Sequence, residues 1–388
     1  MRTILIVFVC IGLLMELPTI SEYAWFGIYT KYTLLQMKFC LYMVQSPWYF
    51  NIIWGKLVDV LDLQLGKIYL LVSALYNICF WKFTEIFFDV SGYAPLIIGL
   101  LGACEFFPSV LTALVFKQAY LYQEDDPDII IKCTRAITVG KILGAILSNL
   151  ILTPQVYMEN LYNAMQFLTC ALTGWLLFSD NPQSRSDLQS NRAEELLDSR
   201  AELDSLTLFI FLYTVIPIYS FAVMFYVSSL ETMATSSMTF IQSLDYIGEL
   251  VGTFIVFRSM PVATIAKIAS AWFLVSVMAY SMILNFATSE NLYLLISLST
   301  ISLWSLDSSM NVTFNYRINR SVTYDEQGLV SNKYLFVVFC ANFIRNIVTY
   351  STAYYVGLDY SNFKGLQELF IGPLTLGVLL VIYSSLLK

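Results

Sequence analysis

The chain has 388 residues, of which 58% are hydrophobic, 16% are aromatic and only 13% are charged, and its formal net charge is −7. A soluble domain carries roughly a quarter charged residues, so this composition excludes an ordinary water-soluble globular protein. It predicts that most of the surface faces lipid. The negative net charge comes mainly from one loop, so it indicates little about binding partners.

The sequence contains seven cysteines and no histidine. Structural metal sites need clustered Cys and His ligands, and no pair of cysteines has the CxxC spacing, so we expect no metal site and no cofactor. Histidine is also the commonest general base. Its absence, together with that of a P-loop or a nucleophile elbow, argues against a membrane-embedded enzyme.

Apolar runs of membrane-spanning length follow one another along the chain. A helix needs about 20 mostly apolar residues to cross a bilayer core. The first run resembles a signal peptide but continues past Glu16 and Pro18, so we interpret it as an uncleaved first helix. We therefore predict an all-α membrane protein with twelve transmembrane helices in two six-helix bundles, with spans near 3–28, 35–58, 68–88, 94–117, 131–153, 160–178, 206–228, 236–258, 262–285, 291–314, 331–355 and 366–387.

One long hydrophilic segment, 179–205, separates the sixth and seventh runs. It divides the chain into an N-terminal bundle, 1–178, and a C-terminal bundle, 206–388. Its charged, Ser-rich composition predicts a solvated linker, either plain or with a short amphipathic helix, and a partner-binding role is the alternative.

The distribution of lysine and arginine predicts the orientation in the membrane. With the N-terminus in the cytoplasm, most of them fall at the inner ends of spans or in the linker, and the outer side receives only Lys31, Lys38, Lys82 and Lys364. The positive-inside rule then places both termini in the cytoplasm. The protein is expected to be a multi-pass protein of the plasma membrane or of an organelle membrane.

A polar hinge, residues 46–67, interrupts the apolar pattern at the inner end of the second span. It carries Pro47-Trp48, then Gly55-Lys-Leu-Val-Asp59, and leads into Gly66-Lys67-Ile-Tyr69. Together with the six-plus-six plan, these motifs resemble the major facilitator superfamily and, within it, the folate-biopterin transporter family. The resemblance implies a secondary transporter whose two halves rock about a site at the membrane midplane.

The same resemblance implies a cytoplasmic gate formed by Gly55, Asp59 and Lys67. It places the inner end of span two beside the start of span eleven, near Lys333, where a carboxylate faces the positive end of a helix. Asp59 would then latch the gate while the outer side is open. The alternative is an ordinary loop that only sets topology.

A set of ionisable residues, the deep charges, lies within the predicted spans. Each costs several kcal/mol in hydrocarbon unless it is paired or hydrated, so each is a functional candidate. The set consists of Glu16, Glu105, Lys141, Asp245, Glu249, Asp307 and Arg345.

The predicted roles of these residues follow from their neighbours in the sequence. Asp245 and Glu249 lie four residues apart and share a helix face, whereas Arg345 shares a polar stripe with Asn342, Asn346 and Thr349. Lys141 either lines the cavity or forms a structural ion pair with Asp245 or Glu249 across the two halves. We expect the substrate to be bound by Arg345, Lys141, Glu105, Asn342, Asn346, Asp245 and Glu249. The candidates for proton coupling are Glu16, Glu105 and Asp307, and transport without coupling is the alternative.

The sequence thus predicts a secondary transporter that moves a small polar or anionic organic solute, folate-like or pterin-like by resemblance. The alternatives are a sugar or nucleoside facilitator and a non-transporting membrane receptor or scaffold. The expected partners are a small solute, the lipid bilayer and, if transport is coupled, protons. We expect a monomer that binds no nucleic acid.

Overall fold

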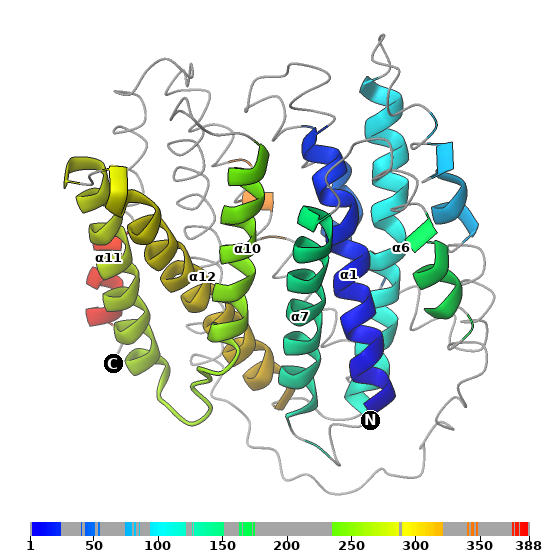
Figure 1. The fold of residues 1–388 in the computed structure, drawn as a ribbon. Helices are drawn as coiled ribbons and strands as arrows, with labels where there is room; N and C mark the ends of the chain where they lie inside the picture. Colours follow the sequence, from blue (N-terminus) through cyan, green and yellow to red (C-terminus); the bar gives the residue numbers. More distant parts are fainter. Residues whose placement is uncertain are drawn as a thin grey trace, which may run out of the picture. The chain divides into compact units, whose positions relative to one another are not determined.

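The computed structural model describes the parts of the chain that are coloured in Figure 1. These are residues 2–24, 40, 43–50, 53–54, 74–79, 81–82, 85, 94–121, 126, 128–150, 163–164, 166–172, 174, 235–286, 289–320, 340, 343–344, 347, 375, 377–379 and 381–386. All regular secondary structure within these residues is helical, which confirms the predicted all-α class. The elements are α1 (Arg2–Ala24), the short α3 (Ser46–Tyr49), α6 (Ala94–Leu121), α7 (Ile129–Leu150), α10 (Thr235–Gly252), α11 (Val262–Phe286) and α12 (Ser289–Arg320).

Two boundaries differ most clearly from the prediction. Helix α10 ends at Gly252 rather than near residue 258. The Thr253 hydroxyl donates to the Leu250 carbonyl at this end, and the chain then continues without a helix to Pro261. Helix α12 continues beyond residue 314 to Arg320, although its last turns are polar. A hydropathy pattern marks where a helix is apolar, so it cannot mark the end of a helix that leaves the apolar layer.

Two described helical stretches are long and apolar enough to cross a membrane, Pro95–Ala113 and Val262–Ala279. Two shorter apolar helical stretches are Ile4–Glu16 and Gly377–Leu386. The number of twelve spans stays a prediction, since several predicted spans lie largely outside the described residues.

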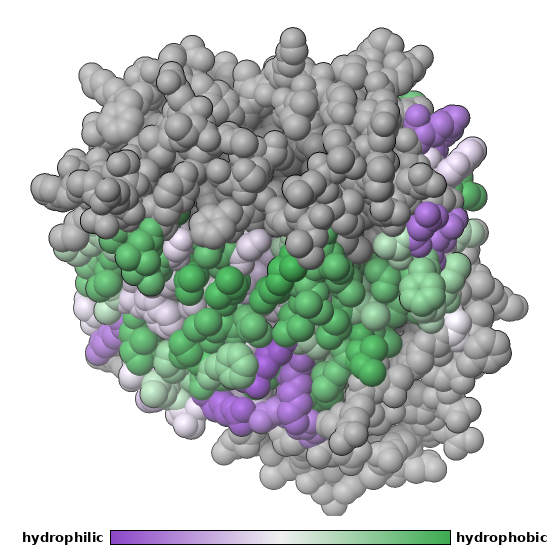
Figure 2. Space-filling model, in the orientation of Figure 1, coloured by the Kyte–Doolittle hydropathy of each residue, from purple (hydrophilic) through white to green (hydrophobic). Residues whose placement is uncertain are grey.

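Apolar side chains lie on the outside of the described helices, as Figure 2 shows for one face. On α7, Val139, Leu143 and Ile146 are exposed and recur at helical spacing along one stripe. On α11, Val275 is 65% exposed and Met278 is 50% exposed. Stripes of exposed apolar side chains of this kind suit a lipid environment rather than water.

The chain divides into two compact units, Met1–Leu196 with Ile318–Phe339, and Leu197–Arg317 with Cys340–Lys388. In the first unit, α1 packs mainly along α7 and also contacts α6, while α3 lies against α6 (Figure 1). The Phe8 and Phe116 rings meet edge to face with their centroids 4.8 Å apart, which joins α1 to α6.

The crossing of α1 and α7 depends on small residues. A Cβ atom at Gly12 would lie 2.9 Å from the Cα of Gly140 and would overlap the Ile137 carbonyl oxygen. A Cβ atom at Gly140 would likewise overlap the Val9 carbonyl oxygen. Only glycine lets the two backbones approach this closely, as is common where membrane helices cross.

In the second unit, α12 contacts α10 on one side and α11 on another. A Cβ atom at Gly248 of α10 would lie 2.7 Å from the Cβ of Trp304, and one at Gly252 would lie 2.8 Å from the Cβ of Ser308. Toward α11, Ser302 accepts a hydrogen bond from the Trp272 indole at 2.9 Å and contacts the Ser276 hydroxyl at 2.9 Å. Close glycine contacts therefore recur in both units.

Candidate functional site

Glu105 lies in the middle of α6 and is 8% exposed. Its Oε2 accepts a hydrogen bond from the Trp48 indole N–H at 2.6 Å. One turn later on α6, the Ser109 hydroxyl donates to the Pro47 carbonyl at 3.2 Å. The Pro-Trp pair at the start of the polar hinge is therefore the point at which α3 holds the buried carboxylate of α6.

Trp54 also joins the Pro47 segment to α6. Its indole donates to the Pro47 carbonyl at 3.0 Å, and its ring meets Phe106 edge to face at 4.4 Å. Pro108 lies inside α6 and has no N–H to donate to the carbonyl four residues earlier, so the helical ladder is interrupted beside Glu105. The site thus combines a buried carboxylate, an indole donor and a weakened helix segment.

Glu16 on α1 and Lys141 on α7 lie at the crossing of these two helices. Glu16 is 3% exposed, and its Cβ lies 2.8 Å from the position of a Cβ at Gly144. The backbone nitrogen of Lys141 lies 2.8 Å from the position of a Cβ at Gly12. Two of the deep charges therefore belong to one helix crossing in one unit.

Asp245, Glu249 and Asp307 belong to the second unit. Asp245 and Glu249 are half-buried and flank Gly248, the residue at which α10 touches α12, and Asp307 on α12 is 8% exposed. The predicted pairing of Lys141 with Asp245 or Glu249 would join the two units, so it stays a prediction.

Several predicted site residues lie outside the described part of the chain. They are the substrate-binding candidates Arg345, Asn342 and Asn346 and the gate residues Asp59, Gly55 and Lys67. Their roles stay predictions.

Helix α12 carries a polar stripe that was not predicted. Ser297, Thr300, Trp304, Asp307, Asn311 and Asn315 recur at intervals of three or four residues and thus share one side of the helix. This side points away from Ser302, which faces α11, by the geometry of 3.6 residues per turn. The signal that could have found the stripe is this spacing, which extends on both sides of Asp307.

A second missed feature, the α12 clamp, holds the turn between α10 and α11 onto the end of α12. The Phe257 backbone N–H donates to the Thr313 hydroxyl at 3.1 Å, and the Ser309 hydroxyl donates to the Ile255 carbonyl at 2.5 Å. The Arg317 guanidinium donates to the Phe257 carbonyl at 3.4 Å and also to the Met260 carbonyl. The clamp therefore satisfies backbone groups of the turn that have no partner within a helix.

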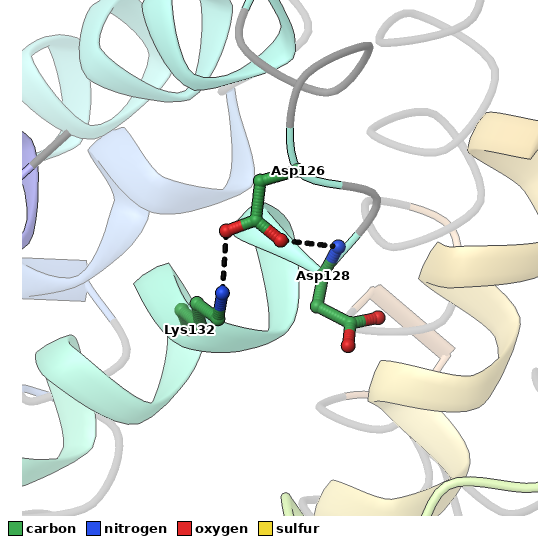
Figure 3. A network of polar contacts seen from close by, with 3 residues as sticks. All are labelled: Asp126, Asp128 and Lys132. Carbon is green, nitrogen blue, oxygen red and sulfur yellow. Dashed lines mark hydrogen bonds and ion pairs between the residues drawn. The ribbon is translucent and has the colours of Figure 1, made fainter.

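The start of α7 is fixed by a small polar network (Figure 3). Asp126 accepts a hydrogen bond from the Asp128 backbone N–H at 3.1 Å and one from the Lys132 ammonium at 2.5 Å. The network therefore consists of an Asx turn just before α7 and an ion pair to the first turn of that helix. We therefore assign it to the end of the helix rather than to a solute site.

The geometry can be compared with that of known proteins. No protein-family model matches the chain, and no curated protein matches it. The folate-biopterin resemblance therefore gains no support from these comparisons.

Solved structures do match over nearly the whole chain. A mutant of the nucleoside transporter NupG superposes with a TM-score of 0.67 at 13% identity, covering 99% of this chain and 98% of that one. A bacterial homologue of the iron transporter ferroportin, in an outward-facing state, gives 0.62 at 12% identity and covers 100% and 99%. A variant of the E. coli fucose:proton symporter FucP gives 0.60 at 16% identity and covers 99% and 97%. At these identities the likeness concerns the fold, and the chain has the major facilitator fold that these transporters share.

Proposed function

We propose that the protein is a secondary transporter that moves a small polar or anionic organic solute across a membrane by alternating access. The observation that carries the proposal is a buried carboxylate, Glu105, held by the Trp48 indole in a fold shared with transporters. A deep carboxylate adds nothing to a helix bundle that only has to be stable, because burying it costs several kcal/mol. It is useful where a solute or a proton must be bound and released.

In this proposal the two predicted six-helix halves rock about a midplane site, and the deep charges bind the solute or protons. Glu16, Glu105 and Asp307 are the candidates for proton coupling, because all three are buried carboxylates. Arg345 would anchor the solute with its two-pronged guanidinium, and Asp59 would latch the cytoplasmic gate. The protein would be a multi-pass membrane protein with cytoplasmic termini.

A sugar or nucleoside facilitator is the second candidate, and it is compatible with two of the similar structures, which are those of a nucleoside transporter and a fucose:proton symporter. The prediction that the solute is a folate or a pterin depends on the hinge motif alone. A non-transporting receptor or scaffold would keep the fold and bind without translocation.

Uptake into proteoliposomes separates these candidates. The purified chain is reconstituted, and the uptake of labelled folate, nucleosides and monosaccharides is followed with and without an imposed pH gradient. A proton-coupled transporter should show uptake that the gradient stimulates and that Glu105→Gln makes independent of the gradient. Uptake that is equally fast with and without the gradient would assign uncoupled transport.

A further inference from the structure

Helix α11 has a single charged residue, Lys267, and it lies on the side that the helix exposes. The stretch Val262–Ala279 of this helix is long and apolar enough to cross a membrane. Its exposed residues recur at intervals of three or four and therefore share one side of the helix. They are Thr264, Lys267, Ala271, Val275 and Met278. Since this side suits lipid, Lys267 is a cation at the edge of a lipid-facing surface.

The position of Lys267 directs its ammonium toward the end of the helix. Within the described part of the chain, Lys267 has no hydrogen bond or ion pair. A charge is costly in hydrocarbon, so a lysine on a lipid-facing side extends its stem to bring the ammonium to the headgroups. Lys267 lies five residues after Val262, about 7.5 Å along the axis. Because the Cα–Cβ bonds of a helix tilt toward its N-terminus, the side chain is aimed at this near end.

The turn between α10 and α11 brings a second cation to the same end. Arg258 is exposed, and its guanidinium carbon lies 5.5 Å from the centroid of the Tyr316 ring of α12, a cation–π contact. The same turn exposes Phe254 by 64% and Met260 by 40%. Cations beside exposed apolar side chains are typical of protein surfaces at the boundary between hydrocarbon and headgroups.

The α12 clamp fixes this turn in place. Its hydrogen bonds join Thr313 and Arg317 to the backbone of Phe257 and Met260, on both sides of Arg258. The turn and the last residues of α12 accordingly lie at the same end of the second unit (Figure 1). A ligand that binds to a surface already held in position loses less free energy to ordering it.

The described segments that meet at this end are basic and contain no acid. Residues 250–289 and 308–320 include Arg258, Lys267, Arg317 and Arg320 but no Asp or Glu. Their charge is therefore complementary to an anion. The predicted orientation places this end in the cytoplasmic leaflet, where anionic lipids attract basic residues.

We infer that a surface formed by Phe254, Arg258, Met260 and Lys267, the basic rim, binds the headgroup of an anionic phospholipid. Arg258 and Lys267 contact the phosphate, and Phe254 and Met260 lie against the adjoining acyl chains. A soluble anion would match the two cations but leave the apolar side chains without a partner. The inference does not depend on the transported solute, and it adds a lipid partner to the proposed function.

The test compares two phospholipids with the same acyl chains, phosphatidylglycerol and the zwitterionic phosphatidylcholine. Binding to the purified full chain is measured by native mass spectrometry. Phosphatidylglycerol should bind at least about fivefold more tightly, the factor expected for one basic side chain near an anionic headgroup. Inorganic phosphate, the soluble probe, should not displace it.

Hydrogen exchange locates the site. In nanodiscs that contain equal parts of the two lipids, the amides of residues 253–261 should exchange more slowly than in nanodiscs of phosphatidylcholine alone. The amides at the start of α7, in the other unit, should exchange equally in both.

The variants separate the rim from a general effect of charge. Lys267→Gln and Arg258→Gln should each weaken phosphatidylglycerol binding about fivefold and leave phosphatidylcholine binding unchanged. Lys267→Arg should retain the affinity. The control is Lys82→Gln, which removes the same charge from an exposed lysine that pairs with Glu85 at 2.8 Å, and it should change neither affinity.

Three results would overturn the inference. They are equal affinity for the two lipids, phosphatidylglycerol affinity that the double variant Arg258→Gln, Lys267→Gln leaves intact, and displacement of the lipid by inorganic phosphate. Uptake into proteoliposomes of phosphatidylcholine alone tests transport separately. Failure of the lipid site is therefore distinguishable from failure of the proposed function.

Discussion

At the scale of single residues, the hydrogen bond from the Trp48 indole to Glu105 should stabilise the fold, because it satisfies a buried carboxylate. Trp48→Phe keeps an aromatic ring but removes the donor, so the carboxylate stays buried with one interaction fewer. We expect a loss of about 1–3 kcal/mol in the free energy of unfolding, measured as a lower midpoint of thermal unfolding in detergent.

Two controls make this prediction specific. Trp54→Phe removes a neutral hydrogen bond to the Pro47 carbonyl and should cost less, about 1 kcal/mol. In a Glu105→Gln background the cost of Trp48→Phe should also shrink, because no carboxylate is then left behind. Equal costs of Trp48→Phe in both backgrounds would show that the indole only fills space.

The candidate site was only partly predictable at this scale. Glu16, Glu105 and Asp307 are recognisable in the sequence, because a carboxylate within an apolar run is conspicuous, and all three are buried in the structure. The partner of Glu105 was not predictable, since Trp48 lies 57 residues away and only the fold brings the two together. The Pro47-Trp48 motif is visible in the sequence, but no local pattern indicates where an indole N–H points.

At the scale of helices, the crossing of α1 and α7 requires glycine at position 140. Gly140→Ala would bring a methyl group against the Val9 carbonyl and force the helices apart. We expect it to destabilise the protein by about 1–3 kcal/mol, as overpacked sites do. The measurement is thermal unfolding together with the yield of monodisperse protein in size-exclusion chromatography.

Gly99 on α6 is the matched control, because no atom of the described residues lies within 4 Å of a Cβ built there. Gly99→Ala should be neutral or stabilising by up to about 1 kcal/mol, since alanine is the better helix former. If both alanine variants unfold at the wild-type temperature, the close crossing is wrong.

The α12 clamp gives a second prediction for the helices. Thr313 is fully buried, and Thr313→Val keeps its shape but leaves the Phe257 backbone N–H without its acceptor. We expect a loss of about 1–3 kcal/mol in stability and faster proteolysis within residues 253–261. Ser385→Ala removes an exposed hydroxyl that bonds only within its own turn, and it should change neither quantity.

The helices themselves were the most predictable part of the fold. The apolar runs that begin near residues 94, 131 and 262 correspond to α6, α7 and α11, because about 20 apolar residues leave little alternative to a helix in lipid. The end of α10 and the continuation of α12 were not predictable, since the clamp that stabilises them joins Phe257 to Thr313 across 56 residues. The neighbours of each helix depend on such distant contacts as well.

At the scale of the whole molecule, the position of the linker tests the proposed topology. A single cysteine introduced between residues 185 and 200, in a background without the native cysteines, should react with an impermeant maleimide only after the membrane is permeabilised. The positive charges of the linker require this, because the positive-inside rule places it in the cytoplasm. Labelling of intact cells or sealed vesicles from the outer side would show that the linker lies outside and that the predicted orientation is wrong.

The gate adds a prediction about the motion of the two predicted halves. Asp59→Asn should lower the maximal rate of uptake several-fold while leaving the solute affinity nearly unchanged, because the predicted latch is at the cytoplasmic end of span two and the predicted solute site is at the membrane midplane. Asp62→Asn, in the same hinge but outside the motif, is the control and should transport at the wild-type rate. An unchanged rate for Asp59→Asn at normal expression would reduce the hinge to a topological signal.

The central claim is that the protein carries a solute across the membrane rather than only binding it. Counterflow in proteoliposomes tests this most directly: vesicles are loaded with an unlabelled solute that stabilises the purified protein, and entry of the same labelled solute is followed. The account predicts a transient accumulation of label above equilibrium, saturable with external solute and absent from protein-free vesicles, because alternating access exchanges solute across the bilayer. Solute that stabilises the folded protein but shows no counterflow in either direction would contradict the account and identify a receptor.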